Sequence, residues 1–251
     1  MTSFPDRKLP FVYEVIHPNG TISHAIATLD YAPLSFEKSI AAHLEGKTNA
    51  LCPSAPSPQE LAEIQEEKFF YELNYWHSAL AKMPDLIQEY DRLSEHERLT
   101  FLIDFKNECQ REETGHRVLE SIEDVVHETA IEKKVHRTSI IPENQYEQLI
   151  SALEHYPALP RLRQRLIIDT YLNGDAEGIS VCLGRQRQKW LDNLPRTLRR
   201  IPTAITPRIV QEAQPFLAQP CLLALDADYF FASEPDLLTL LRANGLKTRR
   251  I

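Results

Sequence analysis

The chain has 251 residues, of which 43% are hydrophobic and 25% charged, so it is long enough to bury a sizeable core. Its formal net charge of −8 argues against nucleic acid as a partner, because nucleic-acid-binding chains are usually basic. No apolar run is long enough for a membrane span, and the first residues lack the apolar segment of a signal peptide. We therefore expect a cytoplasmic protein with no membrane partner.

The first thirty residues have the pattern of a β-hairpin. Residues of β type alternate over Phe11–Ile16 and again over Ile22–Leu29. Asn19-Gly20 lies between the two runs and supplies the positive φ angles that a tight hairpin turn needs. The second predicted strand ends just before Asp30.

Helices are predicted through the middle of the chain. Ser57-Pro58-Gln59-Glu60 combines an N-cap, a proline at the first helical position and a capping-box glutamate, and a long helix is expected from there towards Met83. A second capping box, Ser94-Glu95-His96-Glu97, opens another helix. Further helices are expected over Pro142–His155, Pro160–Leu172 and Asp175–Leu194, with a loop over Asn49–Pro58 and a linker over Pro195–Thr206.

The C-terminal region returns to β structure. Cys221–Leu225 is an apolar run typical of a buried strand, Pro235–Ala243 is a predicted helix, and Leu246–Ile251 is a predicted last strand. These elements predict an α+β fold whose central sheet is built from the N-terminal hairpin and the C-terminal strands. We expect a single domain over 1–251, with a helical subdomain at about 58–195.

Acidic residues follow two of the predicted strands. Asp30 comes after the second strand of the hairpin, and Asp226 and Asp228 come after the run that ends at Leu225. If these strands lie side by side, the three carboxylates converge at a sheet edge and are able to hold Mg²⁺ or Ca²⁺. The alternative is that each aspartate caps its own loop.

Other candidate features have ordinary structural explanations. Arginines 185 and 187 belong to a basic stretch that is either a solvated face or an anion-binding patch. Glu120 belongs to a series at four-residue spacing that an uninterrupted helix would place on one face: Glu108, Glu112, His116, Glu120 and Asp124. A di-iron site needs a second Glu-x-x-His, which is absent, so a solvated charged face is the favoured interpretation. The four cysteines are far apart and form no CxxC pair.

Five stretches occur in the order and with the patterns of one known family. They are Phe11–Pro33, Leu119–Asp124 (LESIED), Asp169–Asp175 (DTYLNGD), Arg185–Trp190 and Cys221–Ile251. Through them the chain resembles the TraB/GumN family, the bacterial relatives of the Tiki metalloproteases. The resemblance implies a related fold and an ancestral metal-dependent hydrolase activity.

The resemblance fails where that family places its chemistry, which is attributed to two Gly-x-x-His motifs, an acidic residue and an arginine. Here the two motifs read Ala27-Thr28-Leu29-Asp30 and Ala227-Asp228-Tyr229-Phe230. The acidic position falls near Pro53-Ser54, and the arginine position falls on Gln186 between Arg185 and Arg187. Of the family's functional residues, only Glu120, in the segment Leu119–Asp124, is clearly retained. Because imidazole is a good ligand for Zn²⁺ or Mn²⁺ and phenylalanine has no lone pair, the inherited metal chemistry should be lost.

These observations lead to three hypotheses about function. The first is a non-catalytic TraB/GumN-like protein without a cofactor, which binds a protein or peptide through Tyr229, Phe230, Arg185 and Arg187. The second is a metal-dependent hydrolase with a rebuilt carboxylate site, with catalytic candidates Asp30, Glu120 and Asp228 and a divalent cation at Asp30, Asp226 and Asp228. The third is a structural or assembly protein that uses its long helices, with the aromatic run Phe69–Trp76 as an interface anchor. The favoured alternative for this run is packing in the core. The oligomeric state stays open.

Overall fold

The computed structural model describes residues 7–29, 36–114, 121–141, 161–193 and 200–251. The chain forms two compact units, of which unit 1 combines Met1–Ala55 with Leu119–Ile251 and unit 2 is Pro56–Val118. Unit 2 is shorter than the helical subdomain expected at about 58–195, because the helices after residue 160 belong to unit 1. The predicted helix at 142–155 lies outside the described residues.

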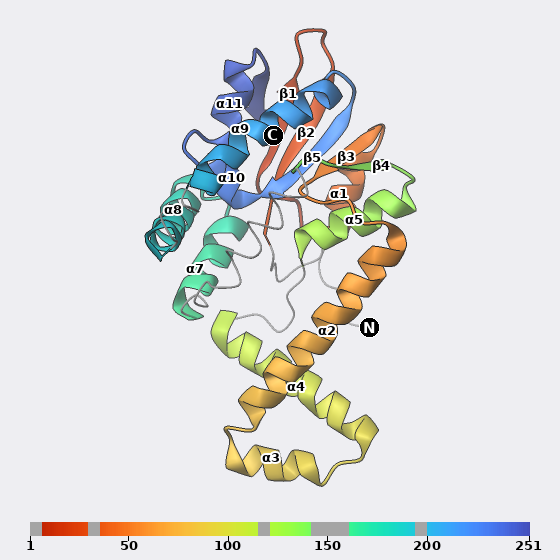
Figure 1. The fold of residues 1–251 in the computed structure, drawn as a ribbon, viewed down its shortest axis with the longest axis vertical. Helices are drawn as coiled ribbons and strands as arrows, with labels where there is room; N and C mark the ends of the chain where they lie inside the picture. Colours follow the sequence, from red (N-terminus) through yellow and green to blue (C-terminus); the bar gives the residue numbers. More distant parts are fainter. Residues whose placement is uncertain (1–6, 30–35, 115–120, 142–160, 194–199) are drawn as a thin grey trace. The chain divides into compact units, whose positions relative to one another are not determined.

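Unit 1 is built on a mixed sheet, which in the described part of the chain has six strands in the order β4-β3-β5-β2-β1-β6 (Figure 1). The hairpin strands pair antiparallel with each other, and β6 pairs antiparallel with β1. The pairs β2–β5, β5–β3 and β3–β4 are parallel. The strands are β1 Val12–Ile16, β2 Ile22–Thr28, β3 Asn49–Cys52, β4 His136–Ser139, β5 Cys221–Asp226 and β6 Lys247–Arg250.

The α+β fold class, with one sheet assembled from both ends of the chain, is confirmed. The hairpin turns at Gly20, whose φ of 88° is the positive value that the Asn-Gly pair predicts. β3 and β4 were not predicted, and β3 falls in the segment expected to be a loop. Each has only four residues, which is too short for an alternating pattern to stand out from its surroundings.

Helices cover both faces of this sheet. α1 (Glu37–Leu44) lies on the path from β2 to β3, and α9 (Arg200–Leu217) on the path from β4 to β5. These two crossovers run in opposite directions across the sheet, so the right-handed rule for parallel connections places their helices on opposite faces. In Figure 1, α9 and α11 (Leu237–Ala243) lie to one side of the strands, and α1 and α5 (Ile122–Glu132) to the other.

The predicted linker at 195–206 is wrong in its second half, because α9 begins at Arg200. Pro202 falls in the first turn, where a helix needs no backbone N–H donor. Pro207 and Pro215 lie inside the helix and each remove one hydrogen bond. The apolar face of α9 offsets this loss, since Ile205, Ile209, Val210, Ala213 and Leu217 are all buried in the core of unit 1.

The segment Asp169–Asp175 ties two helices to the sheet. Tyr171, near the end of α7 (Arg161–Leu172), is fully buried, and its hydroxyl donates to the carbonyl of Ala27 on β2. Gly174 follows with φ 65°, and its carbonyl accepts a hydrogen bond from the Arg250 guanidinium at 3.0 Å. Asp175 then begins α8 (Ala176–Asn193) by accepting from the N–H of Gly178 at 2.9 Å.

Unit 2 consists of three described helices, α2 (Pro58–Leu80), α3 (Pro84–Asp91) and α4 (Glu95–Thr114). The capping box at α2 is confirmed, since Ser57 and Glu60 each bind the other's backbone N–H. Trp76, Leu80 and Leu102 form a small buried core between α2 and α4, and Lys106 pairs with Glu72 at its border.

No helix in the described ranges is both long enough and apolar enough to cross a membrane.

Replacing Tyr171 with Phe removes the hydroxyl that binds the Ala27 carbonyl inside the core. We expect the free energy of unfolding to fall by about 1–2 kcal/mol, as for other buried hydrogen bonds to the backbone. Urea denaturation followed by circular dichroism measures this. Tyr75→Phe is the matched control because Tyr75 is 59% exposed, and it should change stability by less than about 0.5 kcal/mol. Equal stabilities of the two variants would contradict the role given to Tyr171.

Candidate functional site

The carboxyl ends of four parallel strands, β2, β5, β3 and β4, meet at one edge of the sheet. Thr28 of β2 lies in register with Asp226 of β5, so the predicted adjacency of these two strand ends is confirmed. Open sheets with helices on both faces commonly bind ligands at this edge, beyond the strand ends. This edge is therefore the first candidate for a site.

Asp226 caps the short helix that follows β5. Its Oδ1 accepts a hydrogen bond from the N–H of Asp228 at 2.7 Å, which begins α10 (Ala227–Phe231). Asp228 lies in the first turn of α10 and is half-buried. The capping interpretation of Asp226 is thus correct, while its use as a ligand for a cation stays a prediction.

The two aromatic residues of α10 have different surroundings. Phe230 is only 4% exposed, and its ring stacks on Tyr13 of β1 with centroids 5.7 Å apart. Tyr229 is half-buried. Phe230 is thus part of the hydrophobic core, and little of its ring is accessible to a ligand.

The two arginines of α8 lie on different sides of their helix. Arg187 is 8% exposed, whereas Arg185 is exposed, as expected for positions about 200° apart around a helix. Ser180, two turns before Arg187 on the same face, donates to the carbonyl of Phe231 at 2.8 Å. Arg187 therefore lies on the face of α8 that packs against α10, and Arg185 does not.

Asp30 and Glu120 lie outside the described residues, so their convergence with Asp226 stays a prediction. Their neighbours are described, and the N–H of Ile122 donates to the carbonyl of Leu29 at 3.1 Å. The condition for placing residues 108–124 on one helix face, an uninterrupted helix, is not met. α4 ends at Thr114, and Ser121 has extended backbone as the N-cap of α5, with its hydroxyl accepting from Asp124.

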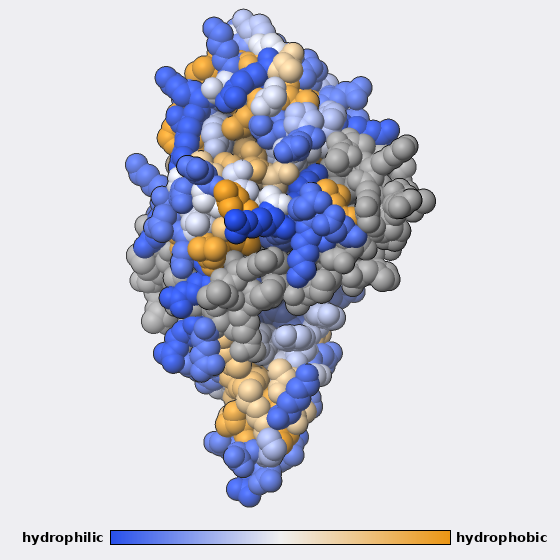
Figure 2. All heavy atoms as spheres, turned by 90° about the vertical axis from the view of Figure 1, so that its left-hand side faces the viewer, coloured by the Kyte–Doolittle hydropathy of each residue, from blue (hydrophilic) through white to orange (hydrophobic). Residues whose placement is uncertain are grey.

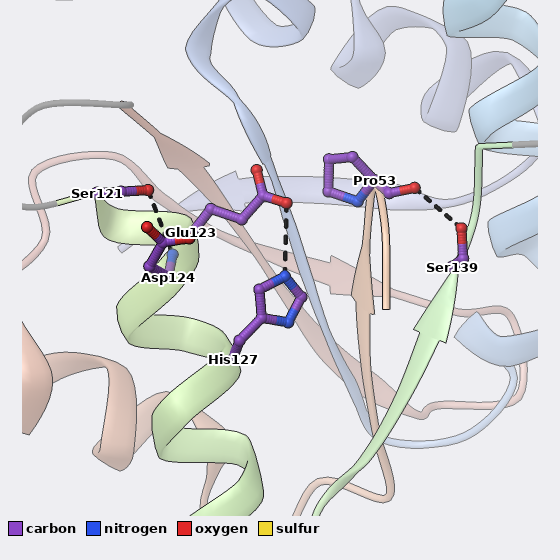
Figure 3. Close-up of polar contacts among 6 residues, drawn as sticks. All are labelled: Pro53, Ser121, Glu123, Asp124, His127 and Ser139. Carbon is purple, nitrogen blue, oxygen red and sulfur yellow. Dashed lines mark hydrogen bonds and ion pairs between the residues drawn. The ribbon is translucent and has the colours of Figure 1, made fainter. Parts of the chain in front are cut away.

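Sequence reasoning missed a pair on α5, the partly buried Glu123 and the buried His127, beside the ends of β3 and β4 (Figure 3). His127 is 2% exposed, and its Nε2 lies 3.5 Å from a carboxylate oxygen of Glu123. Across from them, the hydroxyl of Ser139 donates to the carbonyl of Pro53 at 2.9 Å, which joins the two strand ends. The i,i+4 spacing of Glu123 and His127 within an apolar run was the available signal.

Two of the four thiols are buried in the sheet. Desolvation raises the pKa of Cys52, at the end of β3, and the nearby Glu123 carboxylate raises it further. Burial likewise raises the pKa of Cys221, at the start of β5. Both thiols stay protonated near neutral pH, which makes them poor nucleophiles.

A second polar cluster lies at the opposite end of β2. Nδ1 of His24 is 3.2 Å from Nδ1 of His43 on α1, so one imidazole donates and the other accepts. The pKa of His24 is lowered to about 4, chiefly by burial and also by the Lys47 ammonium and His43, whereas Glu14 opposes the shift. Burial and Lys47 also lower the pKa of His43. This pair fastens α1 to the sheet only while the imidazoles stay largely neutral.

In the ranges that the structure describes, no three histidine, cysteine, aspartate or glutamate side chains gather closely enough to hold a metal ion.

No protein-family model matches the chain, and it matches no curated protein and no solved structure. The resemblance to the TraB/GumN family thus depends on the motifs of the sequence itself.

Lowering the pH should weaken the fold through the His24–His43 pair. Since the pKa of His24 is about 4 in the folded chain and 6.5 in an unfolded chain, the unfolded state binds more protons between these values. The free energy of unfolding should therefore be constant above about pH 6.5 and fall as the pH drops towards 4. Urea titrations at several pH values, on the wild type and on His24→Gln, measure this.

The His24→Gln variant should have a flatter pH profile than the wild type. His96→Gln is the control, because His96 is exposed on α4, and its profile should follow that of the wild type. Parallel profiles for all three proteins would show that the pair contributes nothing to acid sensitivity.

The four cysteines should separate into two classes in a thiol titration. Cys109 and Cys182, which are partly exposed, should react with an aromatic disulfide reagent in the native protein at pH 8. Cys52 and Cys221 should react only at the rate of unfolding, and all four should react rapidly in urea. Mass spectrometry of the labelled peptides identifies the sites, and early labelling of Cys52 would disprove its protection.

Proposed function

We propose that this chain is a non-catalytic protein of TraB/GumN type that acts by binding a protein or peptide. The observation that carries the proposal is the state of Phe230, which stands where the family has its second histidine. Its ring is 4% exposed and stacked on Tyr13, so this position contributes to packing rather than to a ligand set. A phenyl ring has no lone pair for a metal ion.

The other strand-end residues support the same interpretation. The Asp226 carboxylate is engaged as the N-cap of α10. Beyond it, a hydrogen bond from Ser139 to Pro53 joins the ends of β4 and β3, and one from Ile122 to Leu29 joins the start of α5 to the end of β2. A sheet edge held by such contacts is a rigid support for recognition by the loops and helices beyond it.

Tyr229, which is half-buried, is the residue that we assign to contact with a partner at this edge, whereas Arg187 is only 8% exposed and is assigned to packing. Arg187 lies on the α10-facing side of α8, and Tyr229 belongs to α10 itself. Tyrosine is enriched at the centres of protein interfaces. Arg185, on the outer side of α8, is assigned to the rim.

One observation favours the alternative of a rebuilt carboxylate site. Leu29 accepts a hydrogen bond from Ile122, and Thr28 lies in register with Asp226. Asp30 and Glu120 are one and two positions from the bonded pair in the sequence and lie outside the described residues, and the alternative proposal is that their carboxylates join that of Asp226. Such oxygens would suit Mg²⁺ or Mn²⁺ acting on a bound water.

An assay of peptide hydrolysis by the purified full chain separates the two functions. With Mn²⁺, Co²⁺, Zn²⁺ or Mg²⁺ added in turn, we expect no cleavage of a mixed peptide library above that of the chelator-treated protein. The non-catalytic proposal fails if cleavage depends on a metal and is lost in Asp226→Ala. Asp236→Ala is the matched control, because Asp236 caps α11 as Asp226 caps α10 but belongs to no strand end.

A further inference from the structure

Unit 2 carries most of the strongly exposed apolar side chains. Of the eleven large hydrophobic residues that are strongly exposed in the described part of the chain, seven lie in unit 2, although it is only a quarter of the sequence. Figure 2 shows apolar side chains at the surface in its lower part, where the helices of unit 2 lie. The seven are Ile64, Phe69, Phe70, Tyr71, Tyr75, Met83 and Leu99.

Three of these residues form a stripe along α2. Ile64, Tyr71 and Tyr75 are separated by seven and four positions, which places them within about 40° of one another around the helix. They are 40%, 75% and 59% exposed. The core of unit 2 uses the opposite side of the same helix, where Trp76 and Leu80 are buried. α2 therefore has two apolar faces, and only one of them is covered by unit 2 itself.

The surface around this stripe is acidic. Residues 56–118 contain fourteen acidic and seven basic residues, so unit 2 carries −7 of the net charge of −8. α2 has five glutamates and one lysine, and the exposed Glu63 and Glu67 lie beside the stripe. Tyrosines bordered by carboxylates favour a partner with apolar side chains on one face and cations at their margin.

This charge argues against other occupants of the stripe. A second copy of unit 2 would bring two surfaces of like sign together, which costs binding energy. Nucleic acids and anionic membrane surfaces are repelled for the same reason. A basic amphipathic helix satisfies both features, because its apolar residues cover the stripe while its lysines and arginines meet the glutamates.

From this we infer that the outer face of α2 is a docking surface for a basic amphipathic helix of a partner protein, with Ile64, Tyr71 and Tyr75 as its apolar anchors. This inference rests on the proposed function in taking protein binding as what the chain does. It depends on unit 2 alone and on no residue of the sheet edge. Metal-dependent hydrolysis would therefore refute the non-catalytic proposal without touching this one.

The probe is a fluorescein-labelled peptide of about 14 leucines and lysines, with leucines spaced i, i+3, i+4 and i+7. Fluorescence anisotropy with the full chain should show saturable binding. A scrambled peptide of identical composition should bind at least about tenfold more weakly, because it has the charge without the apolar face. Glu63→Gln with Glu67→Gln should reduce the salt dependence of binding.

The double variant Tyr71→Ala, Tyr75→Ala should weaken binding of the probe by about tenfold. Leu166→Ala with Val181→Ala is the matched control, since these residues are 52% and 47% exposed in unit 1, and it should leave binding unchanged. Circular dichroism checks that the helices of each variant are intact, and Ile64→Ala provides an independent variant of the stripe if Tyr75→Ala disturbs Trp76.

Three results would overturn the inference. They are equal binding of the scrambled peptide, unchanged binding by the tyrosine and Ile64 variants, and sedimentation showing a dimer that the tyrosine variant dissolves. The last result would make a second copy of the chain the occupant.

Discussion

The parallel pairing of β2 with β5 is the constraint on which the rest of unit 1 depends. It joins residues 22–28 to residues 221–226, almost the whole chain apart, and both strands are almost completely buried. β1 and β6 extend the sheet on one side of this pair, and β3 and β4 extend it on the other. The chain that follows β2 must therefore come back to the neighbouring position in the sheet by residue 221, where β5 begins. Because such long loops have to close before their contacts can form, folding of unit 1 should be slow relative to that of the local helices of unit 2.

Buried groups also close the hydrophobic core next to the sheet edge beyond Thr28 and Asp226. Tyr171 reaches from α7 to the carbonyl of Ala27, just before this edge, and burial together with the nearby Asp226 raises the pKa of its hydroxyl. Phe230 continues the apolar layer by stacking on Tyr13. Side chains that would otherwise be available for ligands thus close the end of the core. A partner at this edge would meet a preformed surface, which lowers the entropic cost of binding.

Local signals in the sequence predict the parts of the fold that depend on local interactions. Asn19-Gly20 fixes the hairpin, Ser57 and Glu60 fix the start of α2, and the apolar run before Asp226 marks β5. The strands that were missed, β3 and β4, are held by pairing with distant partners, and four residues carry too little pattern to reveal it.

The candidate site shows the same division. The adjacency of the strand ends near Asp30 and Asp226 follows from the order of elements, and the N-cap role of Asp226 follows from its position before α10. The contact between His24 and His43 joins a strand to a helix, and no spacing in the sequence signals it. The sequence pattern also does not show that Phe230 is buried, or that Arg187 is buried while Arg185 is exposed. These differences depend on which face of each helix packs against the rest of unit 1.

The net charge of −8 is distributed unevenly between the two units. Unit 1 is nearly balanced, with 21 basic and 22 acidic residues, whereas unit 2 holds twice as many acidic as basic ones. The buried core of unit 2 is small, consisting of Trp76, Leu80 and Leu102. Repulsion among its excess carboxylates lowers the stability of the folded unit, so these carboxylates do not serve the stability of unit 2. A strongly acidic surface does accelerate encounters with basic partners, and it discourages the apolar stripe of α2 from pairing with another copy of itself. An apolar face and a repulsive charge on the same helix are therefore complementary features, since one provides attraction to a partner and the other restricts which partner is accepted.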